Sequence, residues 1–353
     1  MKSFFGFLFG LFCALMIVLL AGENPLHILE ILIRSSFGSK YDFGLTLFYM
    51  TSLIFTGLSV STAFKSGLFN IGAEGQLNFS ALCMVVFATS YPGITFPGSL
   101  LMILLVGILS GAIWGAIPGL LKAYRGSHEV IVTMMLNFVS AGISSYFISQ
   151  KLQNPDSQNP ESAVISDAFR TNSFDFLNKL LPESPVNLFF IIAILTAVGM
   201  YFFFTKSVLG YEMIAVGENP SAAERASISS KKFVVISLVL SGVLASGAGM
   251  NEVIGYSGQY KIGFSPEFGF MGIAVALMSN NHPLGIIANA FIMSLFHKGA
   301  SDLDIETETI TKDFSKIIQA MVLFGVGLQY YLNKYGVNFG FFKKKKINSS
   351  GNM

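Results

Sequence analysis

Long apolar runs, separated by short polar segments, recur along the whole of this 353-residue chain. A helix needs about 20 predominantly apolar residues to cross the roughly 30 Å hydrocarbon core of a bilayer. Ten windows approach or exceed this length: residues 3–21, 43–65, 71–90, 98–122, 129–150, 187–205, 233–253, 268–280, 283–298 and 314–332. The pattern predicts an all-α polytopic membrane protein with about ten transmembrane helices.

Two details of this pattern need interpretation. The first window follows a single Lys2 and is not followed by a small-residue cleavage site, which favours a retained first helix over a signal peptide. The eighth and ninth windows are separated only by Asn281-His282, before Pro283. They could be two spans or one broken helix.

The composition excludes an ordinary soluble fold. Hydrophobic residues make up 52% of the chain and charged residues only 12%, against roughly 25% charged in an average soluble domain. A soluble domain of this length could not bury so much apolar surface and still cover itself with polar groups.

The distribution of charge tests the number of helices, because cytoplasmic loops of membrane proteins are enriched in Lys and Arg. With Lys2 inside, ten spans place the basic segments on the cytoplasmic side: Lys65, the Lys122/Arg125 turn, residues 206–232 and the tail 333–353. The acidic segments 151–186 and 299–314 then lie on the other side. This alternation predicts an even number of spans, with both termini cytoplasmic.

No pattern for catalysis or metal binding is present in the sequence. The chain lacks a Gly-x-x-x-x-Gly-Lys-Ser/Thr phosphate loop, and its four His and two Cys have no metal-ligand spacing. We therefore expect no catalytic residues, metal, cofactor or nucleic-acid partner. If the protein uses ATP, another chain must hydrolyse it.

The most informative polar cluster, residues 67–78, runs from just after the second window into the start of the third. It contains Asn70, Glu74, Gln76 and Asn78 together with three glycines in twelve residues. A carboxylate at membrane depth is costly unless it is paired, protonated or facing water, and irregular backbone is tolerated there only in protein or at a cavity. We interpret the cluster as a segment lining a pathway. The alternative is a cytoplasmic turn that caps the following helix.

Two further clusters have weaker signals. Residues 247–252 combine glycines that allow close helix packing with Asn251, the best candidate there for contact with a substrate. In residues 280–285, His282 fits a helix cap better than a pH switch. Asn137 could line a cavity or bond across helices.

The longest basic segment, 206–232, contains a short helix signal. Asn219-Pro220 marks a helix start, because Pro suits the first turn, and residues 221–228 follow with small side chains that include Ala222 and Ala223. A short helix with small side chains suits docking into a groove on a partner. An amphipathic connector lying on the membrane is the alternative.

Four motifs resemble those of a known family. They are Phe-Asn-Ile-Gly-Ala-Glu-Gly-Gln at 69–76, Gly-x-Asn-Pro-x-Ala-Ala at 217–223, Gly-Met-Asn-Glu-Val at 249–253, and Gly-Ile-Ala-Val-Ala-Leu at 272–277 followed by His-Pro-Leu-Gly-Ile at 282–286. In this order they resemble the ABC permeases for nucleosides and simple sugars. They are most similar to purine-nucleoside uptake permeases that work with a lipoprotein binding protein. The resemblance covers about residues 43–332.

The resemblance implies a heteromeric, ATP-driven importer in the cell inner membrane. Residues 1–332 would form one permease domain, paired with a second and related permease subunit. Two ATPase subunits would grip the 217–228 segment as a coupling helix through Gly217, Asn219, Pro220, Ala222 and Ala223. An extracytoplasmic lipoprotein would deliver the ligand to a pathway formed by Asn70, Glu74, Gln76, Asn78 and Asn251.

The chain departs from the family pattern at three places. Ser227 stands where the family usually has Gly, Met271 where it has Asp, and Ser279-Asn280 where it has Gly-Arg.

Two other functions stay open from the sequence. The same machine could carry ribose- or galactose-type sugars. A less favoured alternative is an ion-coupled secondary carrier, because the chain has no series of intramembrane carboxylates of the kind that proton-coupled carriers use.

Overall fold

The computed structural model describes residues 2–171, 177 and 180–307, together with scattered positions between 317 and 332. Most of the tenth apolar window and the basic tail 333–353 therefore lie outside the described residues. Within them the fold is helical, with no β-strand and only two isolated bridges, Gln153–Ser162 and Glu161–Lys261.

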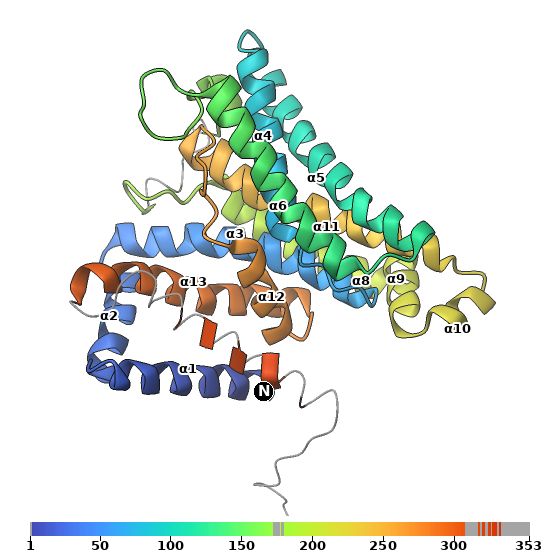
Figure 1. The fold of residues 1–353 in the computed structure, drawn as a ribbon, viewed down its shortest axis with the longest axis horizontal. Coiled ribbons are helices and arrows are strands. Elements are labelled where there is room, and N and C mark those ends of the chain that lie inside the picture. The colour runs from blue at the N-terminus through green and yellow to red at the C-terminus, as the bar shows by residue number, and fades with distance from the viewer. Residues whose placement is uncertain are drawn as a thin grey trace, which may run out of the picture.

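Most helices follow one another through short connections, but a long one separates Leu152 from Leu188 (Figure 1). In chain order they are α1 (Lys2–Leu20), α2 (Pro25–Phe37), α3 (Lys40–Lys65), α4 (Ala73–Ser90), α5 (Gly98–Arg125), α6 (Glu129–Phe147), α8 (Leu188–Lys206), α9 (Val208–Glu218), α10 (Pro220–Arg225), α11 (Ser230–Glu252), α12 (Phe268–Met278) and α13 (Pro283–Glu306). Shorter turns are the π-helices η1 (Ile148–Leu152) and η4 (Val253–Ser257) and the 3-10 helix η2 (Asp167–Phe169).

Several helices are long and apolar enough to cross a bilayer. Five of the described helices meet this condition: α3, α5, α6 with η1, α8, and α11 with η4. The pair α1–α2, bent by 119°, would make a sixth if it is one broken span. An all-helical, multi-pass membrane protein is thus confirmed, whereas the number ten stays a prediction.

The helix α2 was not predicted from the apolar windows. It begins where the Asn24 side chain accepts a hydrogen bond from the backbone N–H of Leu26 (2.9 Å), with Pro25 in the first turn. Its buried face, including Ile28 and Ile31, packs against Val18 of α1. A helix of 13 residues is shorter than a membrane span, so no apolar window of spanning length marks it in the sequence.

The eighth and ninth windows form two separate helices, α12 and α13. Asn280 and Asn281 have positive φ angles of 47° and 57°, which end α12 in a sharp turn. His282 then caps α13 by accepting from the backbone N–H of Gly285 (3.4 Å), as predicted. The acidic segment 299–314 was predicted as a loop, but this is wrong for its first part, because α13 continues to Glu306.

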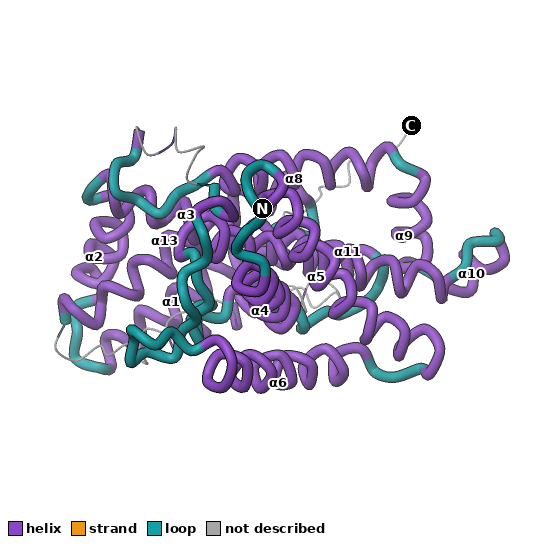
Figure 2. Tube along the Cα trace, turned by 90° about the horizontal axis from the view of Figure 1, so that it is seen from above, coloured by secondary structure: helices purple, strands orange, loops and turns teal. Residues whose placement is uncertain are grey.

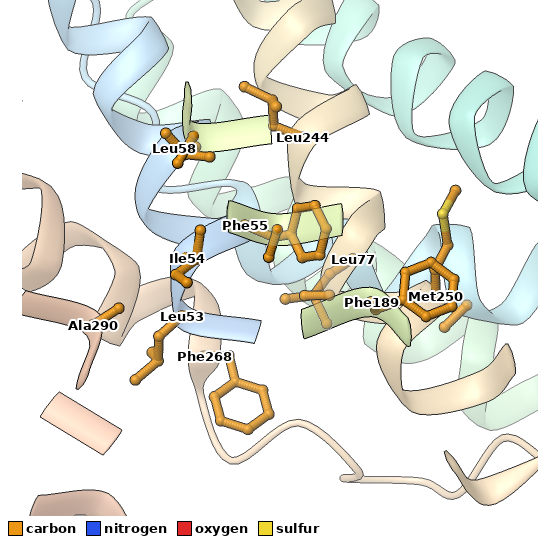
Figure 3. Packing of buried hydrophobic residues seen from close by; sticks show 14 of the residues in the cluster. Leu53, Ile54, Phe55, Leu58, Leu77, Phe189, Leu244, Met250, Phe268 and Ala290 are labelled. Carbon is orange, nitrogen blue, oxygen red and sulfur yellow. The ribbon is translucent and has the colours of Figure 1, made fainter. Parts of the chain in front are cut away.

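The centre of the fold is α11, which packs against α5 and α3. A Cβ atom added at Gly242 of α11 would lie 2.1 Å from the carbonyl oxygen of Gly111 on α5, so the two backbones approach as only glycine allows. Around this contact Phe55, Leu77, Leu244 and Met250 belong to one large hydrophobic cluster (Figure 3).

The basic turns gather at one end of the bundle. The ammonium group of Lys65 lies 5.0 Å from the centre of the Phe204 ring, and that of Lys231 lies 6.0 Å from the centre of the Tyr124 ring. Lys65, the turn after α5 and the 206–232 segment therefore share what we call the basic end, as the charge pattern requires. Figure 2 shows α2 at the opposite end from α10.

The contact between α11 and α5 gives a stability test. We expect Gly242→Val to lower the midpoint of thermal unfolding in detergent, because overpacking typically costs about 1–3 kcal/mol. Survival of the monodisperse peak in size-exclusion chromatography after heating measures the change.

The matched control is Gly142→Val, since a Cβ at Gly142 of α6 would have no atom within 4 Å. Equal midpoints for the two variants would contradict the close α5–α11 approach.

Candidate functional site

An unwound segment, residues 66–72, joins α3 to α4 inside the bundle. The hydroxyl of Ser237 on α11 donates to the Ser66 hydroxyl (2.6 Å), and the Asn70 side-chain amide donates to the Ser241 hydroxyl (2.7 Å). Ser241 lies eleven residues beyond the start of α11, which corresponds to about 16 Å along the helix. The segment therefore reaches well into the interior.

Polar side chains of α6 satisfy backbone groups of this segment and of the first turn of α4. The backbone N–H of Ile71 donates to the Thr133 hydroxyl (3.3 Å), and that of Gly75 donates to Asn137 Oδ1 (2.8 Å). Asn137 Nδ2 donates in turn to the Ile71 carbonyl (3.0 Å). Such partners are needed wherever irregular backbone lies away from water.

Two of the predicted pathway residues, Asn70 and Gln76, lie in the packed interior. Asn70 is fully buried; its Oδ1 accepts from the Gly72 N–H (2.7 Å), and its Nδ2 donates to Gln76 Oε1 (3.2 Å) and to Ser241. Gln76 is 1% exposed. Both side chains hold the turn between α3 and α4, and neither lines a cavity described below.

Asn251 also lies between helices. Its Nδ2 donates to the Ser52 hydroxyl (2.9 Å) and to the Phe48 carbonyl (3.3 Å) on α3, and its Oδ1 accepts from Asn187 Nδ2 (3.0 Å) before α8. It is 1% exposed. Asn251 therefore ties the end of α11 to α3 and α8.

Glu74 and Asn78 occupy a different position, where the N-termini of α4 and α12 meet. Glu74 Oε2 accepts from the backbone N–H of Gly269 (2.8 Å), and Asn78 Nδ2 donates to Glu74 Oε1 (3.0 Å). A Cβ at Gly269 would lie 2.2 Å from the Glu74 nitrogen, so the two helix starts are in contact. The positive ends of both helix dipoles face this carboxylate and favour its charge.

These two side chains line a cavity of about 340 Å³, which we call the polar cavity. Its other walls are α6, through Asn137 and Phe138, and the loop 258–267, through Tyr260, whose hydroxyl donates to Asn78 Oδ1 (3.3 Å). Phe138 is 68% exposed, so the cavity lies at the outer face of α6. The arrangement offers hydrogen-bonding groups on one wall and apolar surface on the other.

The sequence did not single out Tyr260, Gly269 or Ser265, another residue of this cavity wall. One aromatic residue in a polar loop is too common a pattern to identify a cavity. Among the described residues, no group of three His, Cys, Asp or Glu side chains could hold a metal ion.

At the basic end, α9 and α10 extend beyond the last turn of α8 (Figures 1 and 2). Asn219 caps α10 by accepting from the Ala222 N–H (3.0 Å), and Pro220 occupies the first turn, as predicted. The predicted extent to residue 228 is wrong, because α10 ends at Arg225. Ser227 has a φ of +64°, a conformation that favours glycine.

Of the five candidate docking residues, three are exposed and two pack against the rest of the protein. Asn219, Pro220 and Ala222 are exposed, whereas Ala223 is 4% exposed and belongs to the hydrophobic core. A Cβ at Gly217 would lie 2.3 Å from the Lys65 carbonyl oxygen, so Gly217 packs α9 against the end of α3.

Comparisons with known proteins identify the family. Residues 43–327 match the model of the permease component of branched-chain amino acid transport systems. The chain therefore belongs to this family, whose members are transport subunits rather than enzymes.

Three relatives are similar over most of their length. The nucleoside ABC transporter permease NupB of Lactococcus lactis subsp. cremoris is 36% identical, covering 93% of this chain and 89% of NupB. The guanosine ABC transporter permease NupP of Bacillus subtilis is 33% identical, covering 96% and 95%. The glucose ABC transporter permease TsgB13 of Haloferax volcanii is 30% identical, covering 85% and 80%. No solved structure matches the chain significantly.

The different surroundings of Asn70 and Asn78 give a second stability test. We expect Asn70→Leu to destabilise the protein, because a buried polar group left unpaired costs about 1–3 kcal/mol and this change removes the partner of the Gly72 N–H. Thermal unfolding of the detergent-solubilised protein measures the loss.

Asn78→Leu is the comparison, since Asn78 is half-buried at a cavity wall. We expect a smaller fall in its unfolding midpoint than for Asn70→Leu. The reverse order would show that Asn70 does not hold the unwound segment.

Proposed function

We propose that this chain is the membrane-spanning permease subunit of an ATP-driven importer that carries purine nucleosides across the cell inner membrane. The observation that carries the proposal is the polar cavity. In this cavity the Glu74 carboxylate and the Asn78 amide lie near the start of α4, beside the unwound segment 66–72. The chain belongs to the permease family identified above. Amides and carboxylates of this kind can exchange hydrogen bonds with ribose hydroxyls or a purine edge.

The proposed topology has about ten transmembrane helices and both termini in the cytoplasm. The clustering of Lys65, the 122–125 turn and the 206–232 segment at the basic end supports it, because positive residues mark the cytoplasmic side. Residues 1–332 then form one permease domain, followed by the basic cytoplasmic tail 333–353. The match to the family model over residues 43–327 supports a single domain.

Three partner proteins complete the proposed machine. ATPase subunits dock on the exposed side of α10, through Asn219, Pro220 and Ala222. A second permease subunit covers the polar cavity at the exposed face of α6, where Phe138 lies. A substrate-binding lipoprotein docks at the end opposite the basic end. The ABC transporter names of the three relatives support an ATP-driven assembly.

The names of NupB and NupP favour nucleosides as the substrate. The name of TsgB13 keeps a sugar as the second candidate, because that relative is described as a glucose permease. Both candidates carry hydroxyl groups that Glu74 and Asn78 could bind. A nucleoside also carries a base, which a sugar lacks.

Uptake in cells that express the complete transporter tests this function. We expect accumulation of radiolabelled guanosine that excess inosine inhibits and excess ribose does not, because the base contributes to recognition. Inactivating the ATPase subunit is expected to abolish uptake. Accumulation that instead follows a proton gradient with the ATPase inactive would overturn the proposal, and uptake of ribose alone would overturn its substrate.

The proposed docking of α10 gives a separate prediction. We expect Ala222→Trp to abolish co-purification of the ATPase subunit, because a bulky ring on this exposed face prevents the helix from entering a groove. The amount of the variant in the membrane fraction is expected to equal that of the wild type.

Ser149→Trp serves as the control, since Ser149 is exposed in η1, beyond the end of α6 that lies away from the basic end. This variant is expected to retain the ATPase. Normal co-purification with Ala222→Trp would rule out α10 as the docking helix.

A further inference from the structure

A second and larger cavity, of about 600 Å³, lies at the end of α3 farthest from the basic end. We call it the aromatic cavity. Its walls come from the first turns of α3, the end of α11 with η4, the start of α12, the last turns of α13 and residues 263–267 of the connecting loop. Ligand sites in proteins have volumes of about 300–1,000 Å³ and are lined mainly by apolar and aromatic groups.

Aromatic rings form a continuous series along one side of this cavity. The ring of Tyr256 lies 5.3 Å from that of Phe48, and the ring of Phe48 lies 5.8 Å from that of Tyr49. The ring of Tyr49 lies in turn 4.7 Å from that of His297 and 5.9 Å from that of Phe268. The planes of Phe48 and its two neighbours are inclined by 57° and 59°, so the rings offer separate faces, and single aromatic faces are usual stacking partners of a nucleobase.

The charged side chains that line the aromatic cavity are both acidic. They are Glu252, at the last residue of α11, and Glu267, before α12. No Lys or Arg is among the described residues that line it. A phosphorylated nucleotide would therefore find no cation to pair with, whereas a neutral nucleoside needs none.

Glu252 lies where its carboxylate can accept hydrogen bonds from the edge of a base stacked in this cavity. Its neighbour Asn251 is bonded to the Phe48 carbonyl (3.3 Å), so the end of α11 is fixed against the part of α3 that carries Phe48 and Tyr49. The Glu252 side chain is half-buried and lines the cavity beside Tyr256. A carboxylate accepts two hydrogen bonds side by side, and the N1–H and 2-amino groups of guanine offer two donors at that spacing.

The geometry points to the aromatic cavity as an entry site for a purine nucleoside, with the base against the ring of Tyr256 or Tyr49 and Glu252 accepting from the guanine edge. This inference rests on the proposed function and adds a specificity-determining residue to it. Adenine presents an acceptor at N1, so Glu252 favours guanosine over adenosine.

The aromatic and polar cavities share a wall. Gly263 and Ser265, in the loop between η4 and α12, line both of them. A nucleoside bound first by its base therefore has the polar cavity, with Glu74 and Asn78, directly beyond this loop. The order is aromatic cavity first, because it lies farther from the basic end.

Photolabelling of the assembled wild-type transporter tests the location. 8-Azidoguanosine, a photoreactive purine nucleoside, is cross-linked to the purified complex and the labelled peptides are identified by mass spectrometry. We expect label on peptides that contain residues 41–49, 252–256 or 297–301, which line the aromatic cavity alone, and competition by guanosine. Label confined to α4 or α6, or label that guanosine does not displace, would overturn the entry site.

Transport by single variants tests the role of each group. Glu252→Gln keeps the shape but loses one acceptor, and we expect the KM for guanosine to rise at least about tenfold while that for adenosine changes less than about twofold. Tyr49→Leu removes a stacking surface and is expected to raise both KM values by about tenfold. Tyr91→Leu is the control, an exposed Tyr at the end of α4 that lines neither cavity.

The outcomes separate this inference from the proposed function. A wild-type complex that transports neither nucleoside would refute both. A wild-type complex that transports guanosine while Glu252→Gln affects guanosine and adenosine equally, or affects neither, would refute the role of Glu252 and leave the importer intact.

Discussion

The structure depends on how the backbone between α3 and α4 is satisfied. An unpaired peptide group away from water costs several kcal/mol, yet residues 66–72 leave the helical conformation well inside the bundle. Thr133 and Asn137 of α6 and the side chain of Asn70 supply the missing hydrogen bonds. These bonds fix where α4 begins, and they thereby bring Glu74 to the first turn of α12.

The long helix α3 connects the two ends of the molecule. Its last turn is held against Gly217 of α9, and its first turns carry Phe48 and Tyr49 at the aromatic cavity. Its 26 residues correspond to about 39 Å. A displacement of α10 by an ATPase would therefore reach the opposite end through one packed helix, and Asn251 would pass it on to α11 and α8.

Much of this arrangement could be predicted from the sequence, for reasons that individual residues make plain. Long apolar windows identified the helical membrane fold, and Asn219-Pro220 located the start of α10, because both signals are local. Local patterns could not separate Asn70 from Asn78, since one faces Ser241 of α11 and the other faces Tyr260. The aromatic cavity was equally hidden, because its walls come from α3, α11, α12 and α13.

The loop that carries Gly263 and Ser265 also bears on how a substrate would move through the protein. Gly263 and Ser265 belong to the walls of both cavities, so a displacement of this loop changes the shape of both at once. Because one loop borders both cavities, a nucleoside that passes from one to the other would have to move past Gly263 and Ser265.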